Sequence, residues 1–333
     1  MADLTTTYLG LTLRNPLIAG SSGLTSSLEN IKNLERNGIG AVVLKSLFEE
    51  QIMLDAENQM RMARKNHMIY SERSESMDYI DYHIKDDYLS EYLNLIRQVK
   101  EQTTLPVIGS INCNTSGEWV NFAKKIQEAG ADALELNIAL LNANPNKPAL
   151  DVERIHLDIL QSIKKVTSIP VTVKLSPYFC NLAQLICKLE EAGASGAVLF
   201  NRFFSPDIDI DSMEISTGNI YSSPSDYSNS LRWISILSGK CNIDLIGGTG
   251  IHDGKTAIKM MLSGAKSAQI ASTIYKNGFE VIPKMLDEME TWMNRNGYNY
   301  ISQVIGELNQ YKSKEASAYE RIQFMRYYSG IGK

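Results

Sequence analysis

One local pattern recurs four times along the chain and limits the possible folds more than any other feature: a helix end, a glycine, and then a short apolar run. It reads ERNGIGAVVLKS at 35–46, EAGADALELN at 128–137, EAGASGAVLFN at 191–201 and LSGAKSAQIAST at 262–273. A glycine at this place suits the left-handed position that ends a helix, and the four glycines are Gly38, Gly130, Gly193 and Gly264. Each apolar run is typical of a parallel strand buried on both faces.

Four further strands fit the gaps between these units. They are LIAGSS (17–22), PVIGSIN (106–112), VTVKLS (171–176) and DLIGGTG (244–250). Helical spacing alternates with the strands: the apolar stripes comprise Trp119, Phe122, Ala123 and Ile126, and then Ile282, Met285, Leu286, Met289 and Met293. The spacing of Thr115 and Glu118 predicts a capping box at the start of the first of these helices.

Eight strand–helix units over roughly 250 residues predict a (β/α)8 TIM barrel in the α/β class. A doubly wound sheet is the alternative, but no GxGxxG follows the first strand. With 44% hydrophobic and 21% charged residues, the chain can bury a large core. We expect a single barrel over residues 1–310 and a C-terminal extension over 311–333.

Three long strand-to-helix loops indicate which end of the barrel carries the active site. They span 47 to about 89, 140 to 150, and 202 to about 228, and loops after strands lie at the carboxyl face, where barrel active sites are built. We interpret residues 47–88 as a lid insertion after strand 2.

Charge and cysteine content exclude several classes of function. A net charge of −5 without a basic cluster argues against nucleic-acid binding. The four cysteines form no CxxC pair, so we expect no metal and no iron–sulfur centre. The sequence has neither a secretion signal nor a long apolar span, which predicts a cytoplasmic protein with no membrane contact.

Polar residues gather where the predicted strands end. Lys45 and Lys174 end otherwise apolar strands, and a buried lysine usually meets an anionic ligand or loses its proton. Three other predicted strands end in an asparagine, namely Asn112, Asn137 and Asn201. Their amides suit a flat ring that carries carbonyl and N–H groups. GGTGIHDG and QIAST follow strands seven and eight, the usual phosphate cradle of barrels. Together these features favour a phosphorylated heterocyclic cofactor.

At these motifs the chain resembles the dihydroorotate dehydrogenases, and in particular their membrane-independent class. The similar segments are NPLIAGSSG (15–23), VVLKS (42–46), ADALELN (131–137), VKLSPYF (173–179), LFN (199–201), IGGTGI (246–251) and QIAST (269–273). The chain also resembles the flavin domain of dihydropyrimidine dehydrogenase at GSINC (109–113) and EAGADALELN.

The resemblance implies an FMN site and assigns its residues. Lys45, Lys174 and Asn137 would act at the reacting ring. The cofactor would further contact Ser22, Ser46, Asn112, Phe200, one of Ser222 or Ser223, and, through its phosphate, Gly248, Thr249, Gly250, Ala271 and Ser272. Asn201 and Arg202 would face the substrate.

The residues expected around the substrate differ from the family pattern. Leu140 stands where the family has a cysteine or serine that removes the substrate proton, and a positioned base is typically worth about 10²–10⁴ in rate. Substitute bases are Cys113 or a residue of the lid, namely Tyr70, Tyr79, Tyr82 or His83.

Three functions remain open at the sequence level. The first is an FMN-dependent oxidoreductase acting on dihydroorotate or a related small dihydropyrimidine-like substrate, with a soluble electron acceptor and a homodimer as a further option. The second is a flavin-binding homologue with little dehydrogenase activity. The third is an aldolase that forms a Schiff base on Lys174.

Overall fold

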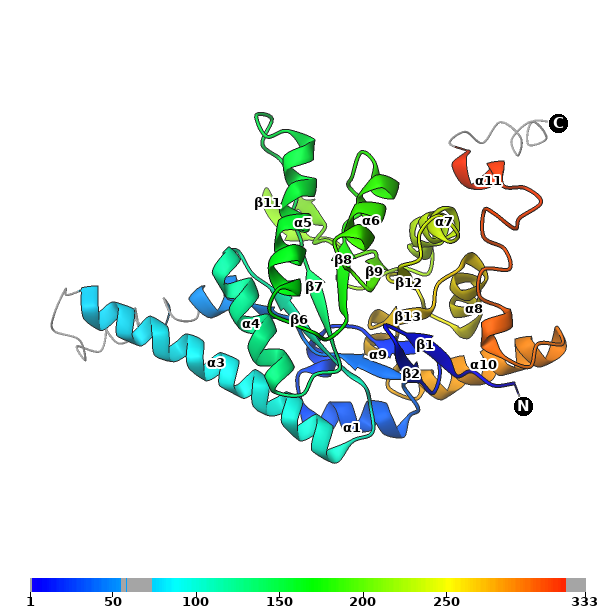
Figure 1. Cartoon of the computed structure of the whole chain (residues 1–333), viewed down its shortest axis with the longest axis horizontal. Helices are drawn as coiled ribbons and strands as arrows, with labels where there is room; N and C mark the ends of the chain where they lie inside the picture. Colours follow the sequence, from blue (N-terminus) through cyan, green and yellow to red (C-terminus); the bar gives the residue numbers. More distant parts are fainter. Residues whose placement is uncertain (1, 55–57, 59–73, 322–333) are drawn as a thin grey trace.

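Eight parallel strands close into a barrel in the computed structural model, which describes residues 2–54, 58 and 74–321 (Figure 1). In ring order they are β4 (Ala41–Val43), β3 (Leu17–Ala19), β13 (Ser267–Ile270), β12 (Asp244–Gly247), β9 (Gly196–Leu199), β8 (Val171–Leu175), β7 (Ala133–Asn137) and β6 (Val107–Asn112). Pairing of Val42 with Val107 joins β4 to β6 and closes the ring. The predicted TIM barrel and its eight strands are confirmed.

Helices alternate with the strands and form the outer layer (Figure 1). They are α1 (Leu28–Arg36), α3 (Ser74–Gln102), α4 (Ser116–Glu128), α5 (Ala149–Lys164), α6 (Leu182–Glu191), α7 (Tyr227–Leu237), α8 (Gly254–Ser263), α9 (Ser272–Asn277) and α10 (Val281–Arg295). The glycine prediction is confirmed, because Gly38, Gly130, Gly193 and Gly264 all have φ between +92° and +118°. The apolar stripes of α4 and α10 pack into the core around the barrel.

A short hairpin closes the amino-terminal end of the barrel. It consists of β1 (Thr6–Tyr8) and β2 (Leu11–Leu13), which pair antiparallel. Tyr8, Leu9 and Leu13 join a buried cluster whose other members come from barrel strands, among them Ile18, Val43, Ile108, Ala133, Val198 and Ile246. These apolar side chains fill the lower barrel, so the interior is closed at that end.

Higher in the barrel the interior side chains become polar. Gln269 of β13 donates a hydrogen bond to Glu135 of β7, although three other strands separate these two along either side of the ring. Such a bond can form only across the interior. The working end of the barrel is therefore lined by groups that can bind and orient a ligand.

The start of α4 differs from the predicted capping box. Thr115 is the N-cap residue, but its side chain makes no capping bond. Instead the buried carboxylate of Glu49 accepts from the backbone N–H groups of Asn114 and Thr115, at 2.7 and 3.0 Å, and from the Thr115 hydroxyl at 3.1 Å. The cap comes from a residue distant in sequence because a carboxylate is favoured at the positive end of a helix.

The predicted lid insertion at 47–88 is partly described. Its first residues form β5 (Leu47–Phe48), which pairs with β6, and a helical turn over 49–54. Helix α3 begins at Ser74, earlier than the loop boundary near 89 implies, and its first turns extend away from the barrel on the left of Figure 1. Its later turns contact α1 and α4.

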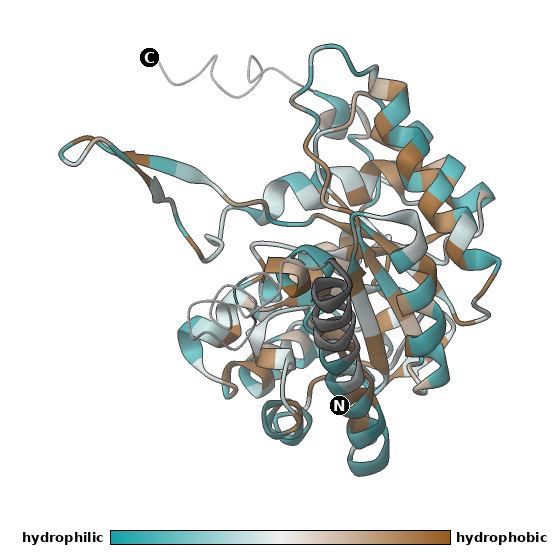
Figure 2. Cartoon of the chain, turned by 90° about the vertical axis from the view of Figure 1, so that its left-hand side faces the viewer, coloured by the Kyte–Doolittle hydropathy of each residue, from teal (hydrophilic) through white to brown (hydrophobic). Residues whose placement is uncertain are grey.

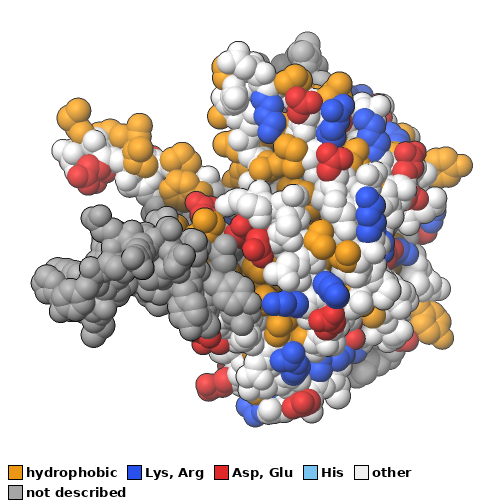
Figure 3. Space-filling view, turned by 60° about the vertical axis from the view of Figure 1, so that its left-hand side comes forward, with side chains coloured by type: hydrophobic (Ala, Val, Ile, Leu, Met, Phe, Trp, Pro, Cys, Tyr) orange, Lys and Arg blue, Asp and Glu red, His pale blue; other side chains and the backbone are white. Residues whose placement is uncertain are grey.

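The loop after β9 carries a hairpin that the sequence analysis did not predict. Strands β10 (Pro206–Asp209) and β11 (Glu214–Thr217) pair antiparallel and stand out from the barrel (Figure 2). Ile208, Ile210, Met213 and Ile215 are 69–86% exposed, so this hairpin has no part in the core. These side chains form the apolar arm visible in Figure 3.

The chain after α10 packs on the outside of the barrel. Backbone bonds from Leu308 to Leu262 and from Gln310 to Ser235 carry it over the ends of α8 and α7, and α11 (Ser317–Glu320) contacts α7. The boundary expected at 310 stays a prediction. No helix within the described ranges is long and apolar enough to cross a bilayer.

Candidate active site at the carboxyl ends of the strands

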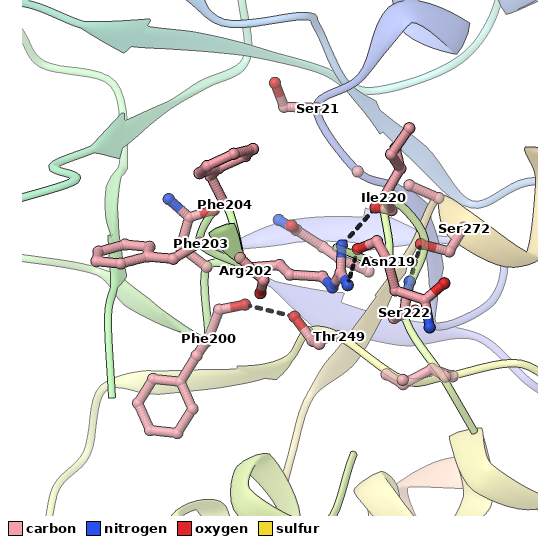
Figure 4. A pocket seen from close by; sticks show the side chains of 18 of the residues that line it. Ser21, Phe200, Arg202, Phe203, Phe204, Asn219, Ile220, Ser222, Thr249 and Ser272 are labelled. Atoms are coloured by element: carbon pink, nitrogen blue, oxygen red, sulfur yellow. Dashed lines mark hydrogen bonds between the residues drawn. The ribbon is translucent and has the colours of Figure 1, made fainter. Parts of the chain in front are cut away.

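A cavity of about 350 Å³ lies at the carboxyl ends of β3, β8, β9, β12 and β13 (Figure 4). This volume is within the range of about 300–1,000 Å³ that is usual for ligand pockets. The cavity brings together nine of the predicted site residues: Lys174, Phe200, Asn201, Arg202, Gly248, Thr249, Gly250, Ala271 and Ser272. The ends of five strands that are far apart in sequence thus meet at one opening.

Lys174 is held at the floor of this cavity by two partners. Its Nζ lies 3.5 Å from Oε1 of Glu135 and donates to Oε1 of Gln269 at 3.2 Å. The Lys174 side chain is 12% exposed, so the cation is almost out of solvent yet borders the cavity. An ammonium so placed can stabilise negative charge that develops on a ligand.

A second polar series crosses the barrel at the same level. Ser46 contacts Ser21 and Ser110 through its hydroxyl, at 3.0 and 2.7 Å, and accepts from Nδ2 of Asn137 at 3.4 Å. Asn137 in turn accepts at Oδ1 from Asn201 Nδ2 at 2.8 Å. The series fixes the orientation of two amides that were predicted to face the cofactor and the substrate.

The glycine-rich turn after β12 provides backbone donors. Gly248 donates to the carbonyl of Leu199, whereas the N–H groups of Thr249 and Gly250 have no acceptor in the described part of the chain. Gly250 has φ +75°, and a Cβ there would come within 2.3 Å of the Tyr227 nitrogen. The chain can make this close turn only with glycine at that position.

The helix that follows the glycine-rich turn is α8, and its first backbone donors are bonded within the protein. The Asp253 side chain accepts from Thr256 at the start of α8, and Gly254 donates to Glu288, so these donors are already used. Ser272, the first residue of α9, borders the cavity instead.

Arg202 and the two candidate serines have definite partners. The Arg202 guanidinium donates to the carbonyls of Asn219 and Ile220, so it anchors the loop that returns from the hairpin (Figure 4). Ser222 borders the cavity and bonds His252 through its hydroxyl at 2.9 Å. Ser223 does not border it, because its hydroxyl donates to Asp226 at 2.7 Å. Of the two serines, the geometry favours Ser222.

Lys45 and Ser46 border a second cavity. It measures about 230 Å³ and is enclosed by the chain after β4 and by Tyr88, Tyr92 and Leu95 of α3. The Lys45 side chain is exposed, so the structure does not place it beside Lys174. Asn112 is half-buried at the end of β6, and Ser22 begins a short turn, where its N–H donates to the Thr25 hydroxyl. Neither of these two residues borders the larger cavity.

The loop after β7 offers no proton acceptor. Leu140 is 38% exposed, and the asparagines beyond it are engaged in their own loop, where Asn142 bonds the carbonyl of Lys147 and accepts from the Asn144 nitrogen. Cys113 is buried in the outer core, and burial raises the pKa of its thiol well above the usual range, with smaller contributions from Glu49 and Glu118. A thiol in that state does not act as a base at neutral pH.

The remaining base candidates are in the lid. Tyr70 lies outside the described residues, as do the side chains of Tyr79, Tyr82 and His83. Their assignment stays a prediction.

Sequence reasoning missed Glu135, Gln269 and Ser21 as parts of the site. A signal was present for the first two, because Glu135 stands two residues before Asn137 and Gln269 two before Ala271. Residues i and i+2 of a strand share one face. A charged or amide side chain one step below a predicted ligand residue therefore faces the same interior.

Comparison with known proteins identifies the family of the chain. The chain matches the family model described as dihydroorotate dehydrogenase over residues 3–293. It is 27% identical over 314 residues to the dihydroorotate dehydrogenase B (NAD(+)) catalytic subunit of Thermoplasma acidophilum, covering 92% of this chain and 99% of the relative. The subunits of the same name from Pyrococcus abyssi and Bacillus mycoides are 28% and 25% identical, over 89% of this chain and 96% and 94% of theirs.

Proposed function

The chain belongs to the dihydroorotate dehydrogenase family, and on that premise we propose that it is an FMN-dependent oxidoreductase acting on a CH–CH bond of a small dihydropyrimidine-like substrate. The observation that carries the proposal is the position of Lys174. This ammonium is nearly buried at the floor of a cavity that also has backbone donors at Thr249 and Gly250 with no acceptor among the described residues. A ring whose reduction adds negative charge, joined to a phosphate, fits both features.

Each part of FMN can be matched to residues that this structure brings to the site. The turn at Thr249 and Gly250, together with Ala271 and Ser272, would hold the phosphate through main-chain groups. Phe200 borders the cavity as a buried apolar surface. Lys174 and Asn137 would face the polar edge of the ring. When bound, FMN supplies the ability to accept a hydride from a substrate carbon.

The chain's own residues orient the reactants and exclude water. Asn137 is 8% exposed and receives its orientation from Asn201, which presents an amide to the cavity. Arg202 keeps the 219–220 segment against the opening. We expect the substrate proton to leave to water or to a lid residue, because Leu140 cannot accept it.

Because Leu140 stands in place of the expected base, we consider a second candidate function, a flavin-binding homologue with little dehydrogenase activity. Loss of the base removes a factor of about 10²–10⁴ while leaving the cofactor residues in place. The aldolase alternative is disfavoured by Glu135. A Schiff base requires a free amine, whereas the Lys174 nitrogen is already held by Glu135 at 3.5 Å and by Gln269 at 3.2 Å.

The electron acceptor is proposed to be soluble. The relatives are named as catalytic subunits of an NAD(+) enzyme, so NAD⁺ acting through a second subunit is the acceptor to test beside small quinones and fumarate. A homodimer and a cytoplasmic location stay predictions.

One experiment separates the two candidates. The purified chain is loaded with FMN, made anaerobic, and mixed with dihydroorotate and with other dihydropyrimidines while the flavin absorbance is followed. Bleaching by one of them identifies an oxidoreductase and its substrate class. Bound flavin that no dihydropyrimidine bleaches supports the silent homologue. Failure to bind FMN rejects both.

A further inference from the structure

Glu135 is fully buried beneath the larger cavity and belongs to a closed ring of three side chains. Its Oε1 lies 3.5 Å from Lys174 Nζ, and its Oε2 accepts from Gln269 Nε2 at 2.5 Å. Lys174 Nζ completes the ring by donating to Gln269 Oε1 at 3.2 Å. The three residues come from β7, β8 and β13. Lys174 and Gln269 border the cavity, whereas Glu135 does not.

Stability alone does not account for a carboxylate at this place. Removing an ion from water costs several kcal/mol, and a buried ion pair is often no more stable than apolar residues of the same size. Glu135 has no exposed surface, and its Oε1 accepts no hydrogen bond within the described ranges. An electrostatic role toward the cavity explains why the charge is kept there.

The charge of Glu135 acts on its surroundings because little water screens it. The pKa of Tyr8, in the hairpin below, is raised well above its usual range, first by burial and then by Glu135. Lys174 lies 3.5 Å from Glu135 and borders the cavity, which Glu135 does not. The carboxylate therefore fixes the ammonium in place and offsets part of its positive charge.

We propose that Glu135 is a positioning residue that sets the reduction potential of the bound flavin through Lys174. This inference rests on the proposed FMN site. When bound, FMN would take up a hydride from the substrate, whose second proton leaves to solvent, and Lys174 would stabilise the negative charge that the ring gains. By weakening the field of that ammonium, Glu135 keeps the potential lower than Lys174 alone would set it.

The test is a redox titration of the FMN-loaded chain against a dye of known potential, at one fixed pH. Glu135→Gln keeps the shape of the side chain and removes its charge. We expect the ratio of reduced to oxidised flavin at a given potential to rise at least tenfold, which corresponds to about 30 mV for a two-electron couple. Lys174→Met should shift the potential in the opposite direction.

Glu153→Gln is the matched control. Glu153 is also a buried glutamate, 5% exposed, paired with a lysine at 3.6 Å, but its partner Lys188 is on α6 and neither residue borders the two cavities described above. Its substitution should leave the potential unchanged. An equal shift in both glutamine variants would overturn the inference, since the effect would then not be local to Lys174.

The outcomes separate this inference from the proposed function. If the wild-type chain binds no FMN, the proposed function fails. If FMN binds and Glu135→Gln has the wild-type potential, only the role of Glu135 is rejected. Should that variant not fold, Glu135→Asp decides the question, because it keeps the charge but draws it away from Lys174. A higher potential in that variant supports the inference, and an unchanged one overturns it.

Discussion

The amide of Asn201 donates to the amide oxygen of Asn137 at 2.8 Å and thereby links β9 to β7 across the intervening strand β8. Two residues at strand ends thus act as a pair. Asn137 is buried, so its orientation depends on this bond and on Ser46.

Replacing Asn201 by leucine should weaken FMN binding about tenfold. The loss of one hydrogen bond is worth roughly 0.5–1.5 kcal/mol, and it frees Asn137 to rotate. Quenching of flavin fluorescence measures the dissociation constant. Asn142→Leu is the control, because that amide bonds only within its own exposed loop. Equal affinities for the wild type and Asn201→Leu would show that Asn137 is oriented without its partner.

Leu140→Cys should accelerate flavin reduction by dihydroorotate. A cysteine restores a group that can accept a proton, worth about 10²–10⁴ in rate. The gain should increase with pH toward the ordinary thiol pKa of about 8.5. Stopped-flow absorbance gives the rate, and Leu141→Cys, one residue further and more exposed, is the control. A rate that is equal in both variants would mean that the base position is not what limits this reaction.

Thr249 occupies a left-handed backbone conformation, with φ +67°, and its hydroxyl donates to the carbonyl of Phe200 at 2.9 Å. This conformation destabilises the folded state by roughly 1–2 kcal/mol for a residue with a Cβ, and the hydrogen bond stabilises it by about 1 kcal/mol. Thr249→Gly should therefore leave the free energy of unfolding almost unchanged, whereas Thr249→Val should lower it by about 1 kcal/mol. Urea denaturation monitored by circular dichroism distinguishes the two. Equal losses in both variants would refute this explanation.

Stability should fall as the pH drops below about 6.5, the ordinary pKa of histidine. Burial lowers the pKa of His156, which lies edge-on to the ring of Phe179 at 5.2 Å. The unfolded chain then takes up the proton before the folded chain does, so the folded state loses up to about 1.4 kcal/mol per pH unit until its own lower pKa is reached. His156→Leu should flatten this slope in urea titrations between pH 7 and 5.

His252 contributes to the same slope. Its pKa is lowered first by burial and then by Lys276. The double variant with His252→Asn should therefore be flatter than His156→Leu alone. A slope that neither substitution alters would assign the acid sensitivity to carboxylates instead.

The barrel could be predicted from sequence because its signals are local. The glycine that ends each helix and the apolar run after it depend on residues a few positions apart, as at Gly38 and Gly264. The capping of α4 could not be predicted, since Glu49 reaches Thr115 from 66 positions away. The same is true of the bond between Glu135 and Gln269, which are 134 positions apart. Only closure of the barrel brings such residues together.

The cofactor half of the site was predictable in part for the same reason. Strand ends at Lys174, Asn201 and Thr249 converge wherever eight strands close, so their meeting at one cavity follows from the topology. The positions of loop residues do not follow from the strand topology. The direction of Arg202 depends on a hairpin, β10–β11, whose alternating sequence buries neither face, and the exposed position of Lys45 depends on the chain that follows β4.

The hairpin of Tyr8, Leu9 and Leu13 has a kinetic consequence. Because it seals the floor of the barrel, the described residues leave Lys174 open toward the rim alone, and two small reactants cannot approach it from opposite ends. A donor would therefore leave the cavity before a small soluble acceptor enters it. Turnover should accordingly alternate between them, and double-reciprocal plots at several acceptor concentrations should be parallel lines.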